Sequence, residues 1–210
     1  MHKNGVSVKN QYKHLELIQI CEIKSGRSIR GAITEVEDTG IRIVQMKDLS
    51  VDGISWDSCI STELTGKSAP DWLVKGDILV LARGNQNYAV LVDDFINDIN
   101  AKVIAAPYFF ILQAKTEKVH STYLTWWLNQ KPVQNYFKTK SRGTGSLSLP
   151  RSALEETEIV LPTVKEQQII ASLYSNLAQQ KAVQQELISN SEQLLAGIAQ
   201  RINNNKEGSR

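Results

Sequence analysis

The sequence predicts an α+β protein in which a strand-rich domain is followed by one long, protruding C-terminal α-helix. Residues 163–202 predict the helix, because they contain no proline and a single glycine, Gly197. The preceding part predicts the strand-rich domain, because short runs of β-branched and aromatic residues alternate there with turn residues. We therefore expect a domain in residues 1–162 and a helix with a polar tail in residues 163–210.

The first elements of the domain are short. Residues 1–14 are polar and have no hydrophobic periodicity, so we expect a frayed arm there. The apolar positions between Leu15 and Cys21 fit either a short helix or a short strand. A basic loop with two glycines follows in residues 24–31.

Four longer strands follow this loop. β-branched and aromatic residues dominate each of them, and turn residues such as Lys75-Gly76-Asp77 separate them. They span residues 40–46, 77–82, 87–92 and 102–114. In the last of these strands, we place Pro107 and Tyr108 in the strand core.

Helical spacing replaces strand alternation in residues 121–140. Leu124 and Leu128 lie one helical turn apart on one side, and Pro132 opens a second short turn. A final strand in residues 157–162 leads into the long helix.

The long helix begins with a capping signal. Thr163 can accept a hydrogen bond from the backbone N–H of Glu166, whose side chain can reach back to Thr163. A helix of this length extends roughly 60 Å, which is longer than the body of a domain of this size. It therefore needs a partner, unless it packs along its own domain or is simply surrounded by solvent. The apolar stripe that would contact a partner comprises Ile170, Leu173, Leu177, Leu187, Leu194 and Ile198.

The stripe follows a spacing of three and four residues, and we call its positions the seam. Three polar residues interrupt the seam, namely Gln180, Gln184 and Ser191. A buried glutamine destabilises every pairing that leaves its amide without a hydrogen-bond partner. These residues therefore favour a helix that selects one register or orientation over a simple strong zipper. We interpret the helix as a spacer and an assembly element.

Composition and charge restrict the possible partners. The formal net charge is +2, so a nucleic-acid partner must meet a local basic surface rather than the charge of the whole chain. Cys21 and Cys59 form no CxxC pair, which suits a reducing cytoplasm, and we expect no disulfide. No apolar run approaches the ~20 residues that cross a bilayer. We therefore expect a soluble, cytoplasmic protein with no membrane partner.

The motifs of several enzyme classes are missing. The sequence lacks the glycine-rich cofactor loop and the Asn- or Asp-Pro-Pro-aromatic segment of a DNA methyltransferase. The nearest resemblance to a metal-dependent nuclease is Asp71 followed by Gln113 and Lys115, in which glutamine replaces the second carboxylate. The three histidines lack the spacing of a zinc site. We therefore expect no catalytic residue, no metal and no cofactor.

A basic stretch is the strongest candidate for a binding surface. No aspartate or glutamate occurs from Lys118 to Arg151, whereas six lysines and arginines do. Two earlier glycine-containing loops add arginines, and arginine, asparagine and glutamine are the residues that pair with base edges in the major groove. The alternative is an ordinary solvated face. The predicted DNA-binding residues are Arg27, Arg30, Arg83, Asn85, Lys131, Lys138, Lys140, Arg142 and Thr144.

Several segments, taken in order, resemble those of the specificity subunits of type I restriction-modification systems. They are IKSGRSIRG, IRIVQMKDLSVDGI, LVKGDILVLARG, STYLTWWLNQ and, above all, GTGSLSLPRSALEETEIVLPTVKEQQII. The last segment is similar to the junction between a target recognition domain and its conserved helix. The resemblance covers about residues 15–202 and rests on order and spacing, since a single motif such as KGDIL is weak alone.

The resemblance implies a subunit that performs no chemistry and reads DNA for a complex in which separate subunits methylate adenine and cleave. Members usually carry two recognition domains and two long helices that pair antiparallel, which gives a split target with a fixed spacer. This sequence has one domain and one helix, so we identify it as a half-length form. We expect a homodimer in which residues 163–202 pair as an antiparallel coiled coil. Pairing with another half subunit, or a fragment of a rearranged locus, are the alternatives.

The sequence leaves three hypotheses for the function. The first is a sequence-specific DNA-binding specificity subunit that directs partner methyltransferase and endonuclease subunits to a bipartite DNA target. The second is a small metal-dependent nuclease that uses Asp71 and Lys115. The third is a coiled-coil adaptor or decoy, which binds the modification subunits through its helix without reading DNA itself.

Overall fold

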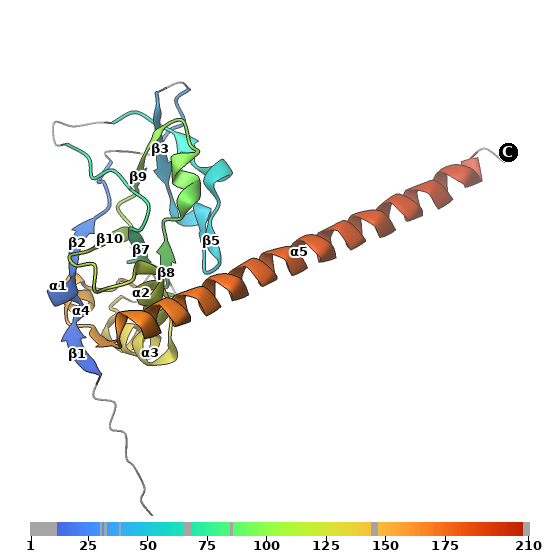
Figure 1. Ribbon diagram of the computed structural model, residues 1–210. Coiled ribbons are helices and arrows are strands. Elements are labelled where there is room, and N and C mark those ends of the chain that lie inside the picture. Colours follow the sequence, from blue (N-terminus) through green and yellow to red (C-terminus); the bar gives the residue numbers. More distant parts are fainter. Residues whose placement is uncertain are drawn as a thin grey trace, which may run out of the picture. The chain divides into compact units, whose positions relative to one another are not determined.

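The computed structural model describes residues 12–29, 31, 33–37, 39–64, 69–84, 86–143 and 147–207. The chain divides into two compact units, Met1–Ala171 and Ser172–Arg210 (Figure 1). The first unit contains all the described strands and the first turns of the long helix, and the second contains the rest of that helix. Within the described ranges, every helix is too short or too polar to span a lipid bilayer.

The centre of the first unit is a four-stranded antiparallel sheet with the order β2–β10–β7–β8. Strand β10 pairs with β2 through Leu112 opposite Ile23, and with β7 through Phe110 opposite Val80. The bounds are Cys21–Ser25 for β2, Ile78–Leu81 for β7, Ala89–Leu91 for β8 and Phe109–Ala114 for β10.

A second sheet has the order β6–β3–β9, in which β3 and β9 run parallel and β3 and β6 run antiparallel. Its strands are β3 (Ile41–Val44), β6 (Ile60–Ser61) and β9 (Lys102–Ala105). Between β3 and β6, the chain forms a hairpin of β4 (Leu49–Ser50) with β5 (Gly53–Ile54) and the 3-10 helices η1 (Met46–Asp48) and η2 (Trp56–Ser58). A third 3-10 helix, η3 (Asp94–Asn97), precedes β9.

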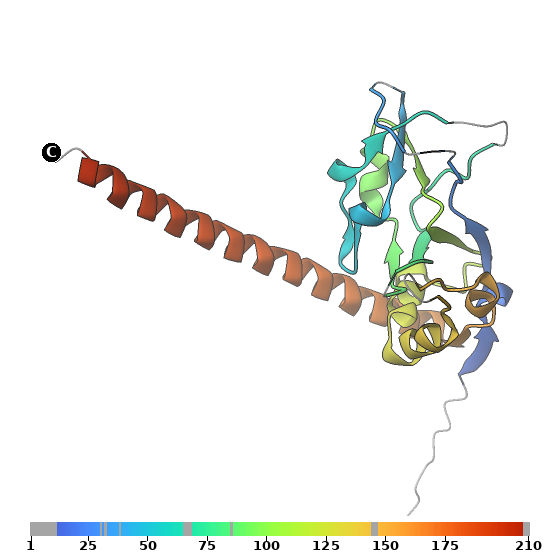
Figure 2. The same ribbon diagram turned by 180° about the vertical axis from the view of Figure 1, so that it is seen from behind.

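The two ends of the first unit meet in a third pairing, because β1 (Lys13–Glu16) runs antiparallel to β11 (Glu158–Leu161). Figures 1 and 2 show the short helices at one end of this unit, whereas β3 and β9 lie at the other end. These helices are α1 (Leu17–Ile20), α2 (Ser121–Leu128), α3 (Lys131–Lys140) and α4 (Arg151–Glu155).

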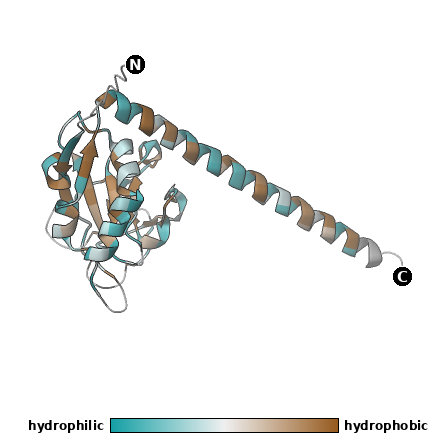
Figure 3. Cartoon of the chain, turned by 90° about the horizontal axis from the view of Figure 1, so that it is seen from below, coloured by the Kyte–Doolittle hydropathy of each residue, from teal (hydrophilic) through white to brown (hydrophobic). Residues whose placement is uncertain are grey.

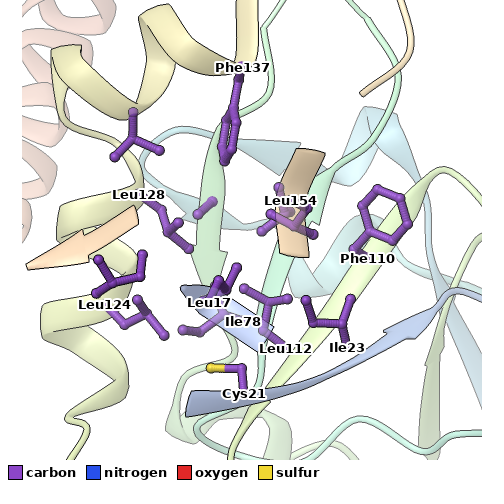
Figure 4. Packing of buried hydrophobic residues seen from close by; sticks show 14 of the residues in the cluster. Leu17, Cys21, Ile23, Ile78, Phe110, Leu112, Leu124, Leu128, Phe137 and Leu154 are labelled. Carbon is purple, nitrogen blue, oxygen red and sulfur yellow. The ribbon is translucent and has the colours of Figure 1, made fainter. Parts of the chain in front are cut away.

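Two hydrophobic clusters cover the two faces of the central sheet. Ile78 and Val80 of β7 belong to a cluster that includes residues of α1, α2, α3 and α4 (Figure 4). The alternate residues Leu79 and Leu81 belong to a second cluster, which includes residues of β3 and β9. Successive side chains of a strand point to opposite faces, so a strand covered on both faces is apolar throughout. This explains the continuous apolar runs in β7 and β10.

The long helix α5 spans Val164–Glu207 and begins as the sequence predicts. The backbone N–H of Thr163 donates to Oε2 of Glu166 (2.9 Å), and the backbone N–H of Glu166 donates to Oγ1 of Thr163 (3.3 Å). Gln167 and Ala171, in the first unit, are buried. The large aliphatic residues of the second unit are exposed, and Figure 3 shows hydrophobic positions recurring along the helix between polar ones.

The predicted stripe divides between the two units. Ile170 is half-buried in the first unit. The other members of the stripe are between 46% and 66% exposed, and they are Leu173, Leu177, Leu187, Leu194 and Ile198. The α+β fold class with a strand-rich domain and a long C-terminal helix is therefore confirmed, and the pairing of that helix stays a prediction.

Several expectations about single elements were wrong. Lys13 and His14 belong to strand β1 rather than to a frayed arm, and the part of the arm expected in residues 1–11 lies outside the described residues. The single strand expected in residues 102–114 is two strands in different sheets, because a turn at Pro107 and Tyr108 separates them. Both turn residues are exposed rather than in a strand core. The helix continues past residue 202 to Glu207, where we expected a polar tail.

Candidate nucleic-acid interface

Two of the predicted DNA-binding residues lie on neighbouring backbone segments. Arg83 follows β7 and Arg142 follows α3, and each forms an antiparallel bridge with Ser148. The backbone N–H of Gly84 donates to the carbonyl of Leu147 (2.9 Å), and that of Arg142 donates to the carbonyl of Ser148 (3.0 Å). Residues directly opposite each other in antiparallel segments place their side chains on the same face. Arg83 and Arg142 therefore project from one surface, about 10 Å apart across Ser148.

A tyrosine ring supports the side chain of Arg83. Cζ of Arg83 lies 5.6 Å from the ring centroid of Tyr108, a distance typical of a cation–π interaction. The backbones hold this pair together, because the N–H of Ala82 donates to the carbonyl of Tyr108 (2.8 Å). Both side chains are exposed. The guanidinium is therefore oriented by the ring and still accessible to a partner.

The loop that carries Arg27 reaches the same turn. The backbone N–H of Arg27 donates to the carbonyl of Ala105 (2.7 Å). Glycine is required just before it, because a Cβ at Gly26 would lie 1.9 Å from the carbonyl oxygen of Ala106. Arg27, whose side chain is half-buried, therefore lies beside the turn that contains Tyr108.

A buried asparagine joins the two basic segments. Nδ2 of Asn87 donates to the carbonyl of Leu81 (2.9 Å), and its Oδ1 accepts from the hydroxyl of Ser141 (3.1 Å). The backbone carbonyl of Asn87 accepts from Nε2 of Gln134 in α3 (3.1 Å). A buried amide that loses its partners destabilises the fold. These hydrogen bonds therefore hold the end of β7, next to Arg83, against the end of α3.

Two exposed lysines extend this surface along α3. Lys138 and Lys140 lie in the last turn of the helix, where positive charge interacts favourably with the helix dipole. Nζ of Lys140 lies 5.4 Å from the ring centroid of Tyr136. In the part of the chain that the structure describes, these two lysines form no ion pair, and neither do Arg83 and Arg142. Their charges are available to an anionic partner.

Among the described residues, Lys131 is not brought into this group. Lys131 begins α3, and about 10 Å of helix separates it from Lys138. Arg30, Asn85 and Thr144 lie outside the described residues. We therefore define the basic surface by six residues, namely Arg27, Arg83, Tyr108, Lys138, Lys140 and Arg142.

Sequence reasoning missed three residues that belong to the basic surface or hold its segments together, namely Tyr108, Asn87 and Ser148. Tyr108 has a local signal, since a proline in the middle of a run of strand formers removes a ladder hydrogen bond and favours a turn. Asn87 and Ser148 have no local signal. Their roles come from contacts with segments that are distant in the sequence.

The residues of the nuclease hypothesis bind to other groups. Asp71 accepts from Nζ of Lys24 (3.2 Å), and Nζ of Lys115 donates to the carbonyl of Ile18 (2.7 Å). Among the described residues, no group of three or more histidine, cysteine, aspartate or glutamate side chains could hold a metal ion. The geometry therefore favours anion binding at the basic surface over metal-dependent chemistry at Asp71.

Comparison with protein families decides the identity of the fold. The model of the type I restriction modification DNA specificity domain matches residues 9–191. The chain belongs to this family. The resemblance inferred from the order of short segments is thereby confirmed. A search of curated proteins found no match.

Three solved structures share the fold of this specificity domain. The HsdS subunit from Thermoanaerobacter tengcongensis is 18% identical, with a TM-score of 0.55 over 87% of this chain and 41% of that one. The S subunit of a type I restriction-modification system from M. genitalium is 16% identical, with a TM-score of 0.52 over 83% and 41%. A structure that describes complex assembly and conformational transition of the type I R-M system is 16% identical, with a TM-score of 0.55 over 91% and 44%. The chain therefore spans less than half the length of each.

Proposed function

We propose that this chain is a DNA-reading specificity subunit of a type I restriction-modification complex and directs partner methyltransferase and endonuclease subunits to a bipartite DNA target. One observation carries the proposal. Ser148 aligns Arg83 and Arg142, which are far apart in the sequence, on a single exposed basic surface. Membership of the DNA specificity domain family supports double-stranded DNA as the partner of that surface. A DNA partner also supports a cytoplasmic location.

The basic surface offers two kinds of DNA contact. Lys138, Lys140 and Arg142 suit phosphates, which position a protein on DNA but carry no sequence information. Arg83, oriented by Tyr108, suits a base edge, because a planar guanidinium can donate two hydrogen bonds to guanine. The proposed contact set also includes Arg27, Arg30, Asn85, Lys131 and Thr144.

In this proposal the chain supplies no catalytic residue and no cofactor, and the partner subunits methylate and cleave the DNA. The ion pair of Asp71 with Lys24 and the hydrogen bond from Lys115 to Ile18 support recognition over the nuclease alternative. The purified chain should neither bind S-adenosylmethionine nor cut DNA in the presence of magnesium. Cleavage by the purified chain would favour the nuclease.

We further propose that two copies pair through antiparallel α5 helices. The exposed stripe that includes Leu173, Leu187 and Leu194 supports this pairing, because such a stripe is normally covered by a partner. The chain spans less than half the length of the S subunits that it matches, so two copies would supply two reading surfaces. The alternatives are pairing with a different half-length chain, or a role as an adaptor or decoy.

Methylation mapping tests the function. Coexpression with the matching modification subunits should switch on adenine methylation at one split sequence, which single-molecule sequencing identifies. A symmetric dimer reads the same half-site twice, so the target should be an inverted repeat with a non-specific spacer. Assembly with the modification subunits without any new methylation would favour the adaptor or decoy.

A further inference from the structure

A cavity of about 300 Å³ lies in the first unit, between α2, β11 and the first turns of α5. We call it the base pocket, because it lies at the base of α5; the name does not refer to a DNA base. Its lining is mostly apolar and aromatic, and includes Tyr12, Trp126, Trp127, Glu166, Ile169 and Ile170. An aromatic cavity with a carboxylate suits a cation on an apolar stem, because the stem packs against the rings while the charge meets the acid.

The carboxylate of the base pocket is ionised at neutral pH. The hydroxyl of Thr163 donates to Oε2 of Glu166 (2.7 Å), and this hydrogen bond is the main reason why the pKa of Glu166 is lowered. The hydroxyl of Tyr12 donates to Oε1 of the same residue (3.3 Å). The pocket therefore presents a negative charge to any side chain that approaches along α5.

The seam of α5 contains a side chain of the required kind. The spacing of three and four residues that passes through Leu194 and Ile198 reaches Arg201 next, and Arg201 is exposed. From Ile170 to Ile198 all seam positions are uncharged. A charged group at a seam opposes pairing unless the partner offers it a compensating group. The choice of register decides what Arg201 meets.

In one register most seam residues match by polarity. This register rests on the antiparallel pairing of two copies proposed above, in which seam positions face each other in fixed couples and registers differ by one heptad. In this register Leu177 lies opposite Leu194 of the second copy, and Gln180 lies opposite Ser191. Leu173 likewise lies opposite Ile198, and Gln180 and Ser191 can form a hydrogen bond, whereas Gln184 lies opposite Leu187.

The same register brings Arg201 of the second copy opposite Ile170, one helical turn from Glu166. We propose that Arg201 of the second copy docks in the base pocket, with its methylene groups against Trp126 and its guanidinium beside the carboxylate of Glu166. A two-fold dimer forms this contact twice. The docking attaches the tip of each helix to the recognition domain of the other copy.

The neighbouring registers are less favourable for Arg201. A shift of one heptad in one direction places Leu177 opposite Arg201, and places Leu194 and Ile198 opposite the seam glutamines, so that no apolar couple remains. A shift in the other direction matches the seam equally well, because it pairs Leu177 with Leu187, Ile170 with Leu194 and Gln180 with Gln184. It places Arg201 opposite Thr163, where Lys13, Lys118 and Glu166 line an adjoining cavity. The two lysines would then repel Arg201. The charges around Arg201 therefore favour the register that fills the base pocket, whose lining contains the carboxylate of Glu166 and no lysine.

Cysteine cross-linking tests this register in the full chain. The proposed register couples Leu173 with Ile198 of the second copy, so L173C/I198C should form a covalent dimer with a short bis-maleimide. The control L173C/S191C reports the register in which Arg201 faces Thr163, and it should stay monomeric on a denaturing gel. The native thiols of Cys21 and Cys59 do not compete, because both are buried and burial raises the pKa of each to about 12.

Removal of the two charges tests the docking itself. R201Q should raise the dissociation constant of the dimer about tenfold, because the contact occurs twice and an exposed ion pair contributes up to roughly fivefold. E166Q retains the capping box, in which glutamine can replace glutamate. In the E166Q background, R201Q should have little further effect. E192Q is the matched control, since Glu192 lies off the seam and its neutralisation should leave the dimer unchanged.

Analytical ultracentrifugation separates the outcomes, and circular dichroism checks that each variant is folded. A cross-linked L173C/I198C dimer with coupled effects of R201Q and E166Q supports the docking. A dimer in which L173C/S191C cross-links instead, or in which R201Q has no effect, overturns the docking and leaves the helix-mediated dimer intact. That result is also expected if another segment of the same chain fills the pocket. A chain that stays monomeric overturns the dimer and the docking together.

Discussion

Neutralisation of the three residues proposed to contact phosphates gives the most direct test of the basic surface. The variant K138Q/K140Q/R142Q removes three exposed positive charges at the end of α3. It should leave the fold intact, because Arg142 pairs with Ser148 through backbone atoms, with N–H···O distances of 3.0 and 2.8 Å. Any loss of DNA affinity then reports charge rather than structure.

The expected size of the effect follows from counterion release. Each phosphate contact contributes about −0.9 to the slope of log K against log salt concentration, so three contacts contribute about −2.7 per recognition domain. Over a fourfold rise in salt, such contacts weaken binding roughly 40-fold, and the variant should lose this dependence. A dimer on two half-sites should show about twice the change in slope. Target and random DNA should be affected about equally, since phosphates carry no sequence information.

Fluorescence anisotropy with labelled duplexes at several salt concentrations measures the slope. K75Q is a suitable control, because Nζ of Lys75 lies 2.5 Å from Oδ1 of Asp94 and this lysine lies outside the basic surface. The control should keep the slope of the unaltered chain. A folded triple variant with an unchanged slope would refute the argument, and the end of α3 would then simply face solvent.

Three further predictions concern the base contact, the dimer and the spacer. R83A should weaken the binding free energy for target DNA by about 1–3 kcal/mol and that for random DNA only slightly. Y108A should reproduce about 0.5–1 kcal/mol of this loss, because it removes the ring under the guanidinium. Equal losses on both DNAs in the same anisotropy assay would assign Arg83 to a phosphate. L187D/L194D should be a folded monomer by light scattering, because two buried unpaired carboxylates oppose pairing by several kcal/mol; an unchanged mass would exclude the helix from the interface. Deletion of residues 180–186, one heptad, keeps the seam in phase and shortens the helix by about 10 Å. Sequencing of methylated adenines should then show a target whose spacer is shorter by about three base pairs. An unaltered target would show that the helix does not set the spacer length.

The elements that the sequence predicts best are those whose signals are local. The reciprocal pair of Thr163 and Glu166 marks the start of α5, and its hydrogen bonds occur as expected. The apolar runs of β7 and β10 are equally local, because burial on both faces requires an apolar side chain at every position. The order of such segments was also sufficient to recognise the family.

The features that the sequence does not predict depend on distant contacts. The turn at Pro107 lies within a continuous run of strand-forming residues, and the structure separates β9 from β10 there because the two strands join different sheets. The neighbourhood of Arg83 and Arg142 depends on their common partner Ser148 and on the buried amide of Asn87. No local pattern encodes such pairings, so the predicted binding residues could be named but not grouped.

The spacer of the DNA target depends on the register of the paired helices more than on their length. In the proposed register, Ala171 lies level with Gln200 of the second copy. The two Ala171 residues, which end the first units, are then about 44 Å apart along the rod, a length of roughly 13 base pairs. A stripe of leucines alone would permit a slide by one heptad, which changes this separation by about 10 Å. In the proposed docking Arg201 opposes the slide, because one shifted register places it opposite Leu177 and the other places it beside Lys13 and Lys118. The contact proposed to close the dimer would therefore also fix the distance between its reading surfaces.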